Sequence, residues 1–113
     1  MSSAPAVAVL TEDLFFRAKI EAVAKAVGVP IRFAGSAGEA QGATTVLVDL
    51  ATGARAIDAV GALKAGPDAP VVVAFGPHRE GEAFKKARAA GADRVLARSA
   101  FVERLPGLLR TGG

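Results

Sequence analysis

The 113-residue sequence contains no cysteine, tryptophan or tyrosine, and its one histidine is His78. Without cysteine, disulfide bonds and thiolate chemistry are excluded, and a single histidine argues against a histidine-based metal site. No apolar run approaches the roughly 18 residues that a membrane-spanning helix needs. The first five residues lack the basic and apolar regions of a signal peptide. We therefore expect a cytoplasmic protein without a membrane partner.

Charge is unevenly distributed along the chain, although the net charge is only +3. Residues 1–78 contain six Lys or Arg against seven Asp or Glu, whereas residues 79–113 contain eight against four. We do not expect nucleic-acid binding, because no aromatic residues interleave with the basic ones and no nucleic-acid motif is present. The basic residues form either a solvated helix face or a surface that steers an acidic partner protein. The candidates for partner binding are Arg79, Lys85, Lys86, Arg88, Arg94 and Arg104.

Short apolar segments alternate with segments of helical periodicity. One helix is indicated by Phe16, Ile20, Val23 and Val27, which follow one another at spacings of four, three and four residues. Strands are predicted at residues 6–10, 31–34, 44–50, 71–75 and 94–97. Helices are predicted from just after Asp13 to Val27, at 55–64, at 82–90 and at 101–110, with only a short, weak helix within 35–42.

This alternation predicts one domain over residues 1–113, with a parallel sheet covered by helices on both faces. The most apolar strands, at 6–10, 44–50 and 71–75, should be central, and 31–34 should lie at or near an edge. Right-handed crossovers then favour a doubly wound sheet of order 2-1-3-4-5, as in flavodoxin-like folds. The loops after the central strands meet at one end of such a sheet.

The residues at that end of the predicted sheet give the chain a pattern that resembles the receiver domain of bacterial response regulators in two-component signalling. The resemblance covers nearly the whole chain. It rests on the spacing from the acidic pair Glu12-Asp13, through Asp49, to the segment 86–96 and Arg98. It implies that Asp49 is the phosphoacceptor candidate, and that Glu12, Asp13 and Asp49 are the candidates for holding Mg²⁺. A carboxylate can attack phosphorus only if cations neutralise the phosphoryl oxygens.

The chain departs from the pattern of that family at several positions. Thr11 stands in place of one of the usual acids, and Phe75 in place of the Thr or Ser that senses the phosphoryl group. Arg98 replaces the usual Lys, and its planar guanidinium is not equivalent to a compact ammonium group. Val95 stands where a switching aromatic residue is common. The resemblance therefore implies a degenerate, or pseudo-receiver, variant.

Each of these residues also has a purely structural interpretation. Asp49 could cap the turn that follows its strand, and Glu12 and Asp13 could serve the start of a helix. Phe75 could be a core aromatic residue. Arg98 could be a surface side chain, or it could pair with Asp49 and neutralise it permanently. We expect His78 to be a loop residue, with a ligand or pH-sensing role as the alternative.

Two functions follow from the resemblance. The first is a receiver-like signalling domain that acts as a protein-interaction module, without conventional phosphorylation switching. The alternative is an active receiver, phosphorylated on Asp49 by a histidine kinase in the presence of Mg²⁺. An unrelated small α/β role, such as a ligand-binding domain, stays open. We do not expect an enzyme. The first function requires no cofactor, and we expect Mg²⁺ binding to be at most weak.

Overall fold

The computed structural model describes residues 6–77 and 81–111, in which strands and helices alternate along most of the chain. The strands are β1 (Val7–Leu10), β2 (Ile31–Phe33), β3 (Thr45–Asp49), β4 (Val71–Gly76) and β5 (Arg94–Ala97). The helices are α1 (Leu14–Val27), α2 (Ala54–Lys64), α3 (Gly81–Ala90) and α4 (Arg98–Thr111), and a short 3₁₀ helix, η1 (Leu50–Thr52), follows β3. Within the described ranges, no helix is long and apolar enough to cross a membrane.

The five strands form one parallel sheet of order β2-β1-β3-β4-β5, which confirms the predicted topology. All five residues of β3 are buried, as its apolar sequence predicts for a central strand. β2 lies at one edge, also as predicted, and its three residues are only half-buried. The register pairs Asp49 with Phe75 on the neighbouring strand. Paired residues of adjacent strands point to the same face of a sheet, so these two side chains are neighbours.

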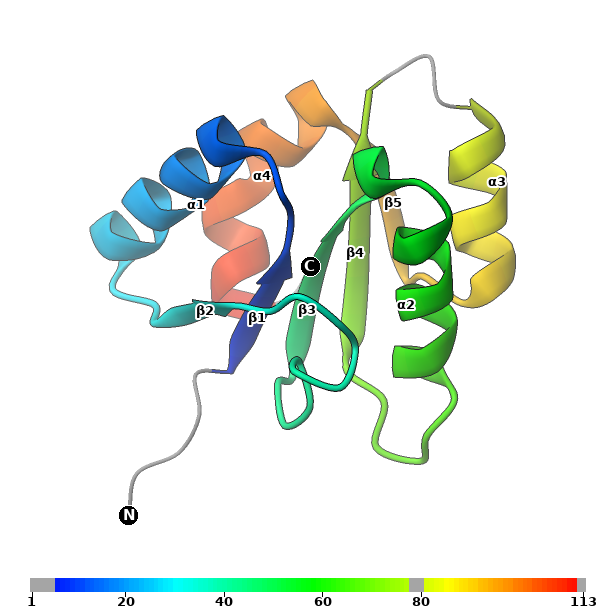
Figure 1. The fold of residues 1–113 in the computed structure, drawn as a ribbon. Helices are drawn as coiled ribbons and strands as arrows, with labels where there is room; N and C mark the ends of the chain where they lie inside the picture. Colours follow the sequence, from blue (N-terminus) through cyan, green and yellow to red (C-terminus); the bar gives the residue numbers. More distant parts are fainter. Residues whose placement is uncertain (1–5, 78–80, 112–113) are drawn as a thin grey trace.

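Helices cover both faces of the sheet, as predicted for a flavodoxin-like sandwich (Figure 1). One face packs Val9, Leu47 and Val73 against α1 and α4. The other packs Val46 and Val72 against α2 and α3. Successive strand residues alternate between these two cores, because side chains along a strand point to opposite faces.

Local signals explain where the helices begin and end. Asp13 caps α1, because its Oδ1 accepts hydrogen bonds from the backbone N–H groups of Phe15 and Phe16. Gly28 ends the same helix in the left-handed region at φ 74°, where glycine carries no steric penalty. The last helix starts earlier than predicted, at Arg98, so this residue belongs to a helix and not to the end of a strand.

The connection between β2 and β3 differs from the prediction. The short helix expected within 35–42 does not form, and the segment makes turns. Gly35, Gly38 and Gly42 disfavour a helix by about 1 kcal/mol each, and Gly42 has a φ of 89°. The sheet beneath is covered by small side chains of this segment, including Ala40. A cavity of about 740 Å³ opens between the segment and α2.

A charged cluster stabilises the end of the sheet at which β4 and β5 begin. The Asp93 carboxylate accepts two hydrogen bonds of 2.8 Å, from Lys64 Nζ and from the backbone N–H of Val72. Lys64 Nζ also donates to the Pro70 carbonyl at 2.8 Å. Burial by itself would raise the pKa of Asp93, but the hydrogen bonds and the charge of Lys64 outweigh it and lower that pKa. The cluster joins the end of α2 to the starts of β4 and β5.

Candidate functional site

Asp49 lies at the C-terminal end of the central strand β3, and only 1 % of it is exposed. Its Oδ2 accepts a hydrogen bond of 2.7 Å from the hydroxyl of Thr11. Its Oδ1 accepts one of 2.9 Å from the backbone N–H of Ala51, which confirms that Asp49 caps the turn after its strand. Both carboxylate oxygens are thus bound by donors of the protein itself. Asp49 joins the loop after β1 to the turn after β3.

Thr11 is the residue that makes this arrangement possible. It is buried, and its hydroxyl donates to Asp49 while accepting a hydrogen bond of 3.1 Å from the backbone N–H of Asp13. A hydroxyl can donate and accept at once, whereas an ionised carboxylate can only accept. The exchange of an acid for Thr11 therefore replaces a negative neighbour of Asp49 with a hydrogen-bond donor.

The two predicted acids after β1 do not join Asp49. Asp13 is occupied at the start of α1, where it caps the helix and lies 3.8 Å from an amino nitrogen of Arg98. Glu12 points outward, with 69 % of its side chain exposed, and forms an ion pair with Arg55 of α2. Arg55 is a partner that the sequence analysis did not consider.

These placements bear directly on metal binding. Across residues 6–77 and 81–111, no three His, Cys, Asp or Glu side chains are grouped so that they could hold a metal ion. The structure does not bring together Glu12, Asp13 and Asp49, the predicted metal ligands. The hydroxyl of Thr11 and the backbone N–H of Ala51 both donate hydrogen bonds to Asp49 and so occupy the carboxylate oxygens that a cation would need. The described residues therefore do not fit Mg²⁺.

Phe75 is a core residue, as its structural interpretation predicted, with none of its surface exposed. Its ring stacks on Phe101 of α4, with centroids 3.9 Å apart and planes at 11°. Phe16 of α1 completes the cluster, with its centroid 5.3 Å from that of Phe75. The strand register places this aromatic cluster directly beside Asp49. Where receiver domains have a small hydroxyl residue, this chain has three packed rings.

Arg98 lies on the outer side of the aromatic cluster. Its guanidinium carbon is 4.7 Å from the centroid of Phe16, which is a cation–π distance, and its charged neighbour is Asp13. The alternative in which Arg98 pairs with Asp49 is wrong, because Arg98 starts α4 and reaches toward Asp13 and Phe16. Its Nε is buried and has no hydrogen-bond partner among the described residues.

Val95, the third predicted switch position, is half-buried on β5 and packs into the core beneath α2 and α3. Phe75 belongs to the core on the other face, beneath α1 and α4. The aromatic ring on β4 therefore does not fill the place of the aromatic residue that receivers carry on β5.

The predicted partner-binding residues that the structure describes are exposed, on two helices and a strand. Those on α3 are Lys85, Lys86 and Arg88, that on β5 is Arg94, and that on α4 is Arg104. Arg79 and His78 lie outside the described residues. The sequence analysis did not identify the hydrogen-bonding role of Thr11 or the aromatic partners of Phe75. A threonine in an acid's position was the available signal for the first.

No protein-family model matches the chain, and no curated protein matches it either. The structure, in contrast, is similar to solved response regulators. One is a putative response regulator from Chloroflexus aurantiacus, with 17 % sequence identity over 96 % of this chain and 99 % of that one, and a TM-score of 0.76. Another is the phosphorylated cyanobacterial phytochrome response regulator RcpA, with 10 % identity over 98 % and 97 % of the two chains and a TM-score of 0.76.

A third similar structure is a response regulator protein from Burkholderia pseudomallei with a phosphorylated aspartic acid, a calcium ion and citrate. It has 21 % identity over 94 % of this chain and 66 % of that one, with a TM-score of 0.72. At these identities the similarity establishes the fold. The chain has the flavodoxin-like fold of response regulator receiver domains.

Proposed function

We propose that this chain is a receiver-like signalling domain that works by binding another protein and not by conventional phosphorylation of Asp49. The observation that carries the proposal is the state of the Asp49 carboxylate. Both of its oxygens accept hydrogen bonds from within the protein, and its predicted acidic neighbours are turned to other partners. A carboxylate held in this way lacks the cations that phosphoryl transfer needs.

The surroundings of Asp49 support the same conclusion. An incoming phosphoryl group needs space beside the carboxylate and positive charge around its oxygens. Here the neighbouring position on β4 is filled by the ring of Phe75, which is locked against Phe101 and Phe16. The guanidinium of Arg98, which stands in place of the usual Lys, is engaged with Asp13 and Phe16.

The second candidate is an active receiver that is phosphorylated by a histidine kinase. One observation favours it: Asp49 ends the third strand of a receiver fold. Two of the similar structures are also described as phosphorylated. In this case Thr11 would have to release Asp49, and Glu12 would have to leave Arg55 before a cation could bind.

The remaining expectations follow from the first candidate. The partner is a protein, with neither nucleic acid nor membrane involved, and the domain catalyses no reaction of its own. It needs no cofactor, and any Mg²⁺ binding is weak. A cytoplasmic location stays a prediction from the sequence.

The deciding experiment is incubation with acetyl phosphate and Mg²⁺, followed by intact mass measurement. We expect no stable phosphoryl adduct, while an active receiver treated in parallel acquires one. The Asp49→Asn variant identifies any adduct that does form. A substantial adduct on the wild type that is lost in Asp49→Asn would refute the proposal and establish the active receiver.

A further inference from the structure

The cavity between α2 and the turns that follow β2 lies where sheets of this kind bind ligands. Its volume is about 740 Å³, within the range of about 300–1,000 Å³ that is usual for small-molecule sites. Leu10 and Phe33 line it from the C-terminal ends of β1 and β2. Open α/β sheets bind their ligands at the C-terminal ends of strands. Figure 1 shows the turns beside α2, at the front of the sheet.

The floor of the cavity is apolar. Leu10 of β1 and Val48 of β3 line it, and both belong to the buried core. On the side of α2 the lining residues include Ala56 and Ala59, which are also buried. Because these two side chains are single methyl groups, they leave the space above the strands open. The floor therefore suits the apolar body of a ligand, which loses contact with water when it binds there.

One cation at the rim of the cavity has no acidic partner. The guanidinium carbon of Arg17 lies 4.2 Å from the centroid of the Phe33 ring. Both side chains are half-buried and line the cavity. Within the part of the chain that the structure describes, no acidic side chain forms an ion pair with Arg17. The ring thus holds the guanidinium in place while its N–H donors stay available for the two oxygens of a carboxylate.

The opposite rim disfavours a ligand with two negative charges. Its charged residues are Glu12, Arg55 and Asp58, which together carry a net charge of −1. Arg55 is paired with Glu12, and Asp58 follows Arg55 by three residues on the same side of α2. All three are exposed, so solvent screens them more than it screens the half-buried Arg17. A doubly charged phosphate would need a second cation, and Arg55 is already engaged.

We propose that this cavity binds a small monocarboxylic acid with an apolar body. The carboxylate pairs with Arg17 at the rim, and the apolar body lies on the floor formed by Leu10 and Val48. The inference goes beyond the proposed function and does not depend on it. Asp49 does not line the cavity, although its hydrogen-bond partner Thr11 does.

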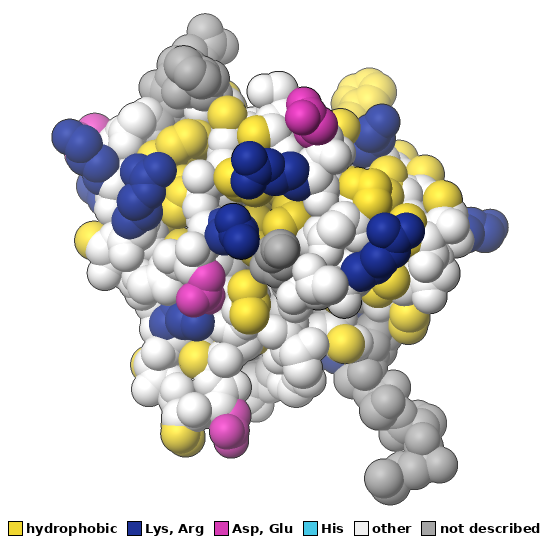
Figure 2. Space-filling model, turned by 180° about the vertical axis from the view of Figure 1, so that it is seen from behind, with side chains coloured by type: hydrophobic (Ala, Val, Ile, Leu, Met, Phe, Trp, Pro, Cys, Tyr) yellow, Lys and Arg dark blue, Asp and Glu magenta, His cyan; other side chains and the backbone are white. Residues whose placement is uncertain are grey.

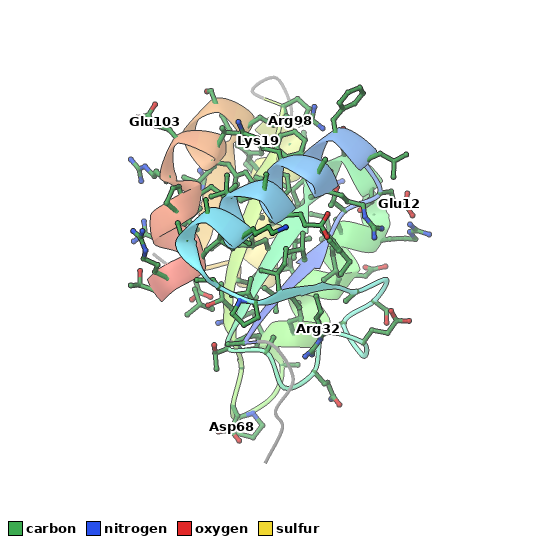
Figure 3. All side chains as sticks on the ribbon, turned by 90° about the vertical axis from the view of Figure 1, so that its left-hand side faces the viewer. Glu12, Lys19, Arg32, Asp68, Arg98 and Glu103 are labelled. Carbon is green, nitrogen blue, oxygen red and sulfur yellow. The ribbon has the colours of Figure 1, made fainter. Side chains whose placement is uncertain are left out.

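Exposed basic residues elsewhere provide the comparison for Arg17. Figure 2 shows Lys and Arg side chains spread over the back of the molecule. Exposed charges hold a single anion weakly, because water and salt screen them. Lys19 is exposed on the same helix as Arg17. Figure 3 shows Lys19 on the side of α1 toward α4, whereas Glu12 lies on the side toward α2 and the cavity.

Titration with 3-phenylpropionate at neutral pH, followed by two-dimensional NMR of the backbone amides, tests the proposal. The uncharged 3-phenylpropionamide and the doubly charged phenyl phosphate are the comparison ligands. Arg17→Met removes the charge but keeps an apolar side chain over Phe33, and Lys19→Met is its matched control. Ala59→Leu fills part of the floor. Circular dichroism shows whether each variant is folded.

We expect saturable shifts at the amides of Gly35, Gly38 and Ala59, with a dissociation constant of about 1 mM or lower. The uncharged amide should bind the wild type about tenfold more weakly or worse, because it cannot form the charge-assisted hydrogen bonds. Arg17→Met should weaken binding of the acid by about the same factor, and Lys19→Met by no more than about twofold. Phenyl phosphate should bind more weakly than the acid, and a folded Ala59→Leu should lose binding.

Several results would overturn the inference. They are the absence of saturable shifts, equal binding of the acid and its amide, and a loss in Lys19→Met as large as that in Arg17→Met. Tighter binding of phenyl phosphate would assign the cavity to dianions, against the proposal. A folded Ala59→Leu that binds like the wild type would place the ligand outside the cavity. If Ala59→Leu does not fold, the comparison of Arg17→Met with Lys19→Met decides.

Discussion

Replacement of Asp49 measures whether this residue serves the fold or is kept for chemistry. The Asp49→Ala substitution removes the acceptor of two hydrogen bonds, from Thr11 and Ala51. A buried donor left without a partner costs about 1–3 kcal/mol. Some relief is expected, since Ala51 lies at the surface and water can reach its N–H group. We therefore expect Asp49→Ala to lower the free energy of unfolding by about 2–4 kcal/mol.

The Asp49→Asn substitution should behave differently. The amide oxygen can still accept from Ala51 and the amide nitrogen can donate to Thr11, but the hydroxyl proton of Thr11 then loses its acceptor. We expect a loss of about 1–2 kcal/mol, smaller than that of Asp49→Ala. The exposed Asp58→Ala on α2 is the matched control, because a surface substitution usually changes stability by about 0.5 kcal/mol or less.

Urea unfolding followed by far-ultraviolet circular dichroism suits this protein, because the chain lacks Trp and Tyr and has no useful intrinsic fluorescence. The slope of the unfolding free energy against urea should stay constant across the variants. If Asp49→Ala is as stable as the wild type or more so, the structural role of Asp49 is wrong. A buried carboxylate that destabilises the folded state would instead indicate a site retained for phosphoryl chemistry.

Three further predictions concern the aromatic cluster, the charged cluster and the missing chemistry. Phe75→Ala should cost about 3–5 kcal/mol in the same unfolding assay, because its ring is fully buried between helix and strand; a loss below about 1 kcal/mol would contradict the packing. Asp93 has a lowered pKa, so its contribution to stability is present above the pKa of the unfolded chain and disappears as the pH falls through the lower pKa of the folded state. Asp93→Asn should therefore lose less stability than the wild type below about pH 4, measured by urea unfolding at several pH values. If both proteins lose the same stability at low pH, the pKa of Asp93 is not lowered by folding. The combined variant Thr11→Asp/Phe75→Thr/Arg98→Lys should acquire a phosphoryl adduct from acetyl phosphate that the wild type lacks, provided that circular dichroism shows it folded; a folded variant without an adduct would mean that these three positions do not account for the difference.

The sheet order was predictable because its signals are local and repeated. Apolar runs such as residues 44–50 and 71–75 can be placed in the centre of a sheet without knowledge of any contact, and handedness then leaves few topologies. The absent helix between β2 and β3 was harder to predict. Its glycines argued against a helix, but the alternation along the rest of the chain favoured one.

The details of the site were less predictable, since they depend on which partner each side chain meets. The interpretation of Phe75 as a core aromatic residue was right, but its stacking on Phe101 joins residues 26 positions apart in the sequence. Pairing of Arg98 with Asp49 was one of two alternatives, but Arg98 instead joins α1, because the helix starts three residues early. Glu12 meets Arg55 across two loops, and no short-range pattern reveals such a pairing.

The turns between β2 and β3 have a consequence for hydrogen exchange. Helices cover the rest of the sheet, whereas residues 35–42 cover the part next to β2 with alanine side chains and turns. Such a segment opens at a lower free energy than the rest of the molecule. The amides of β2 should therefore exchange with solvent through a local opening, whereas those of β1, β3 and β4 should wait for global unfolding. Denaturant would strongly accelerate exchange in β1, β3 and β4 and only slightly accelerate it in β2. The molecule would therefore open from the β2 edge inward.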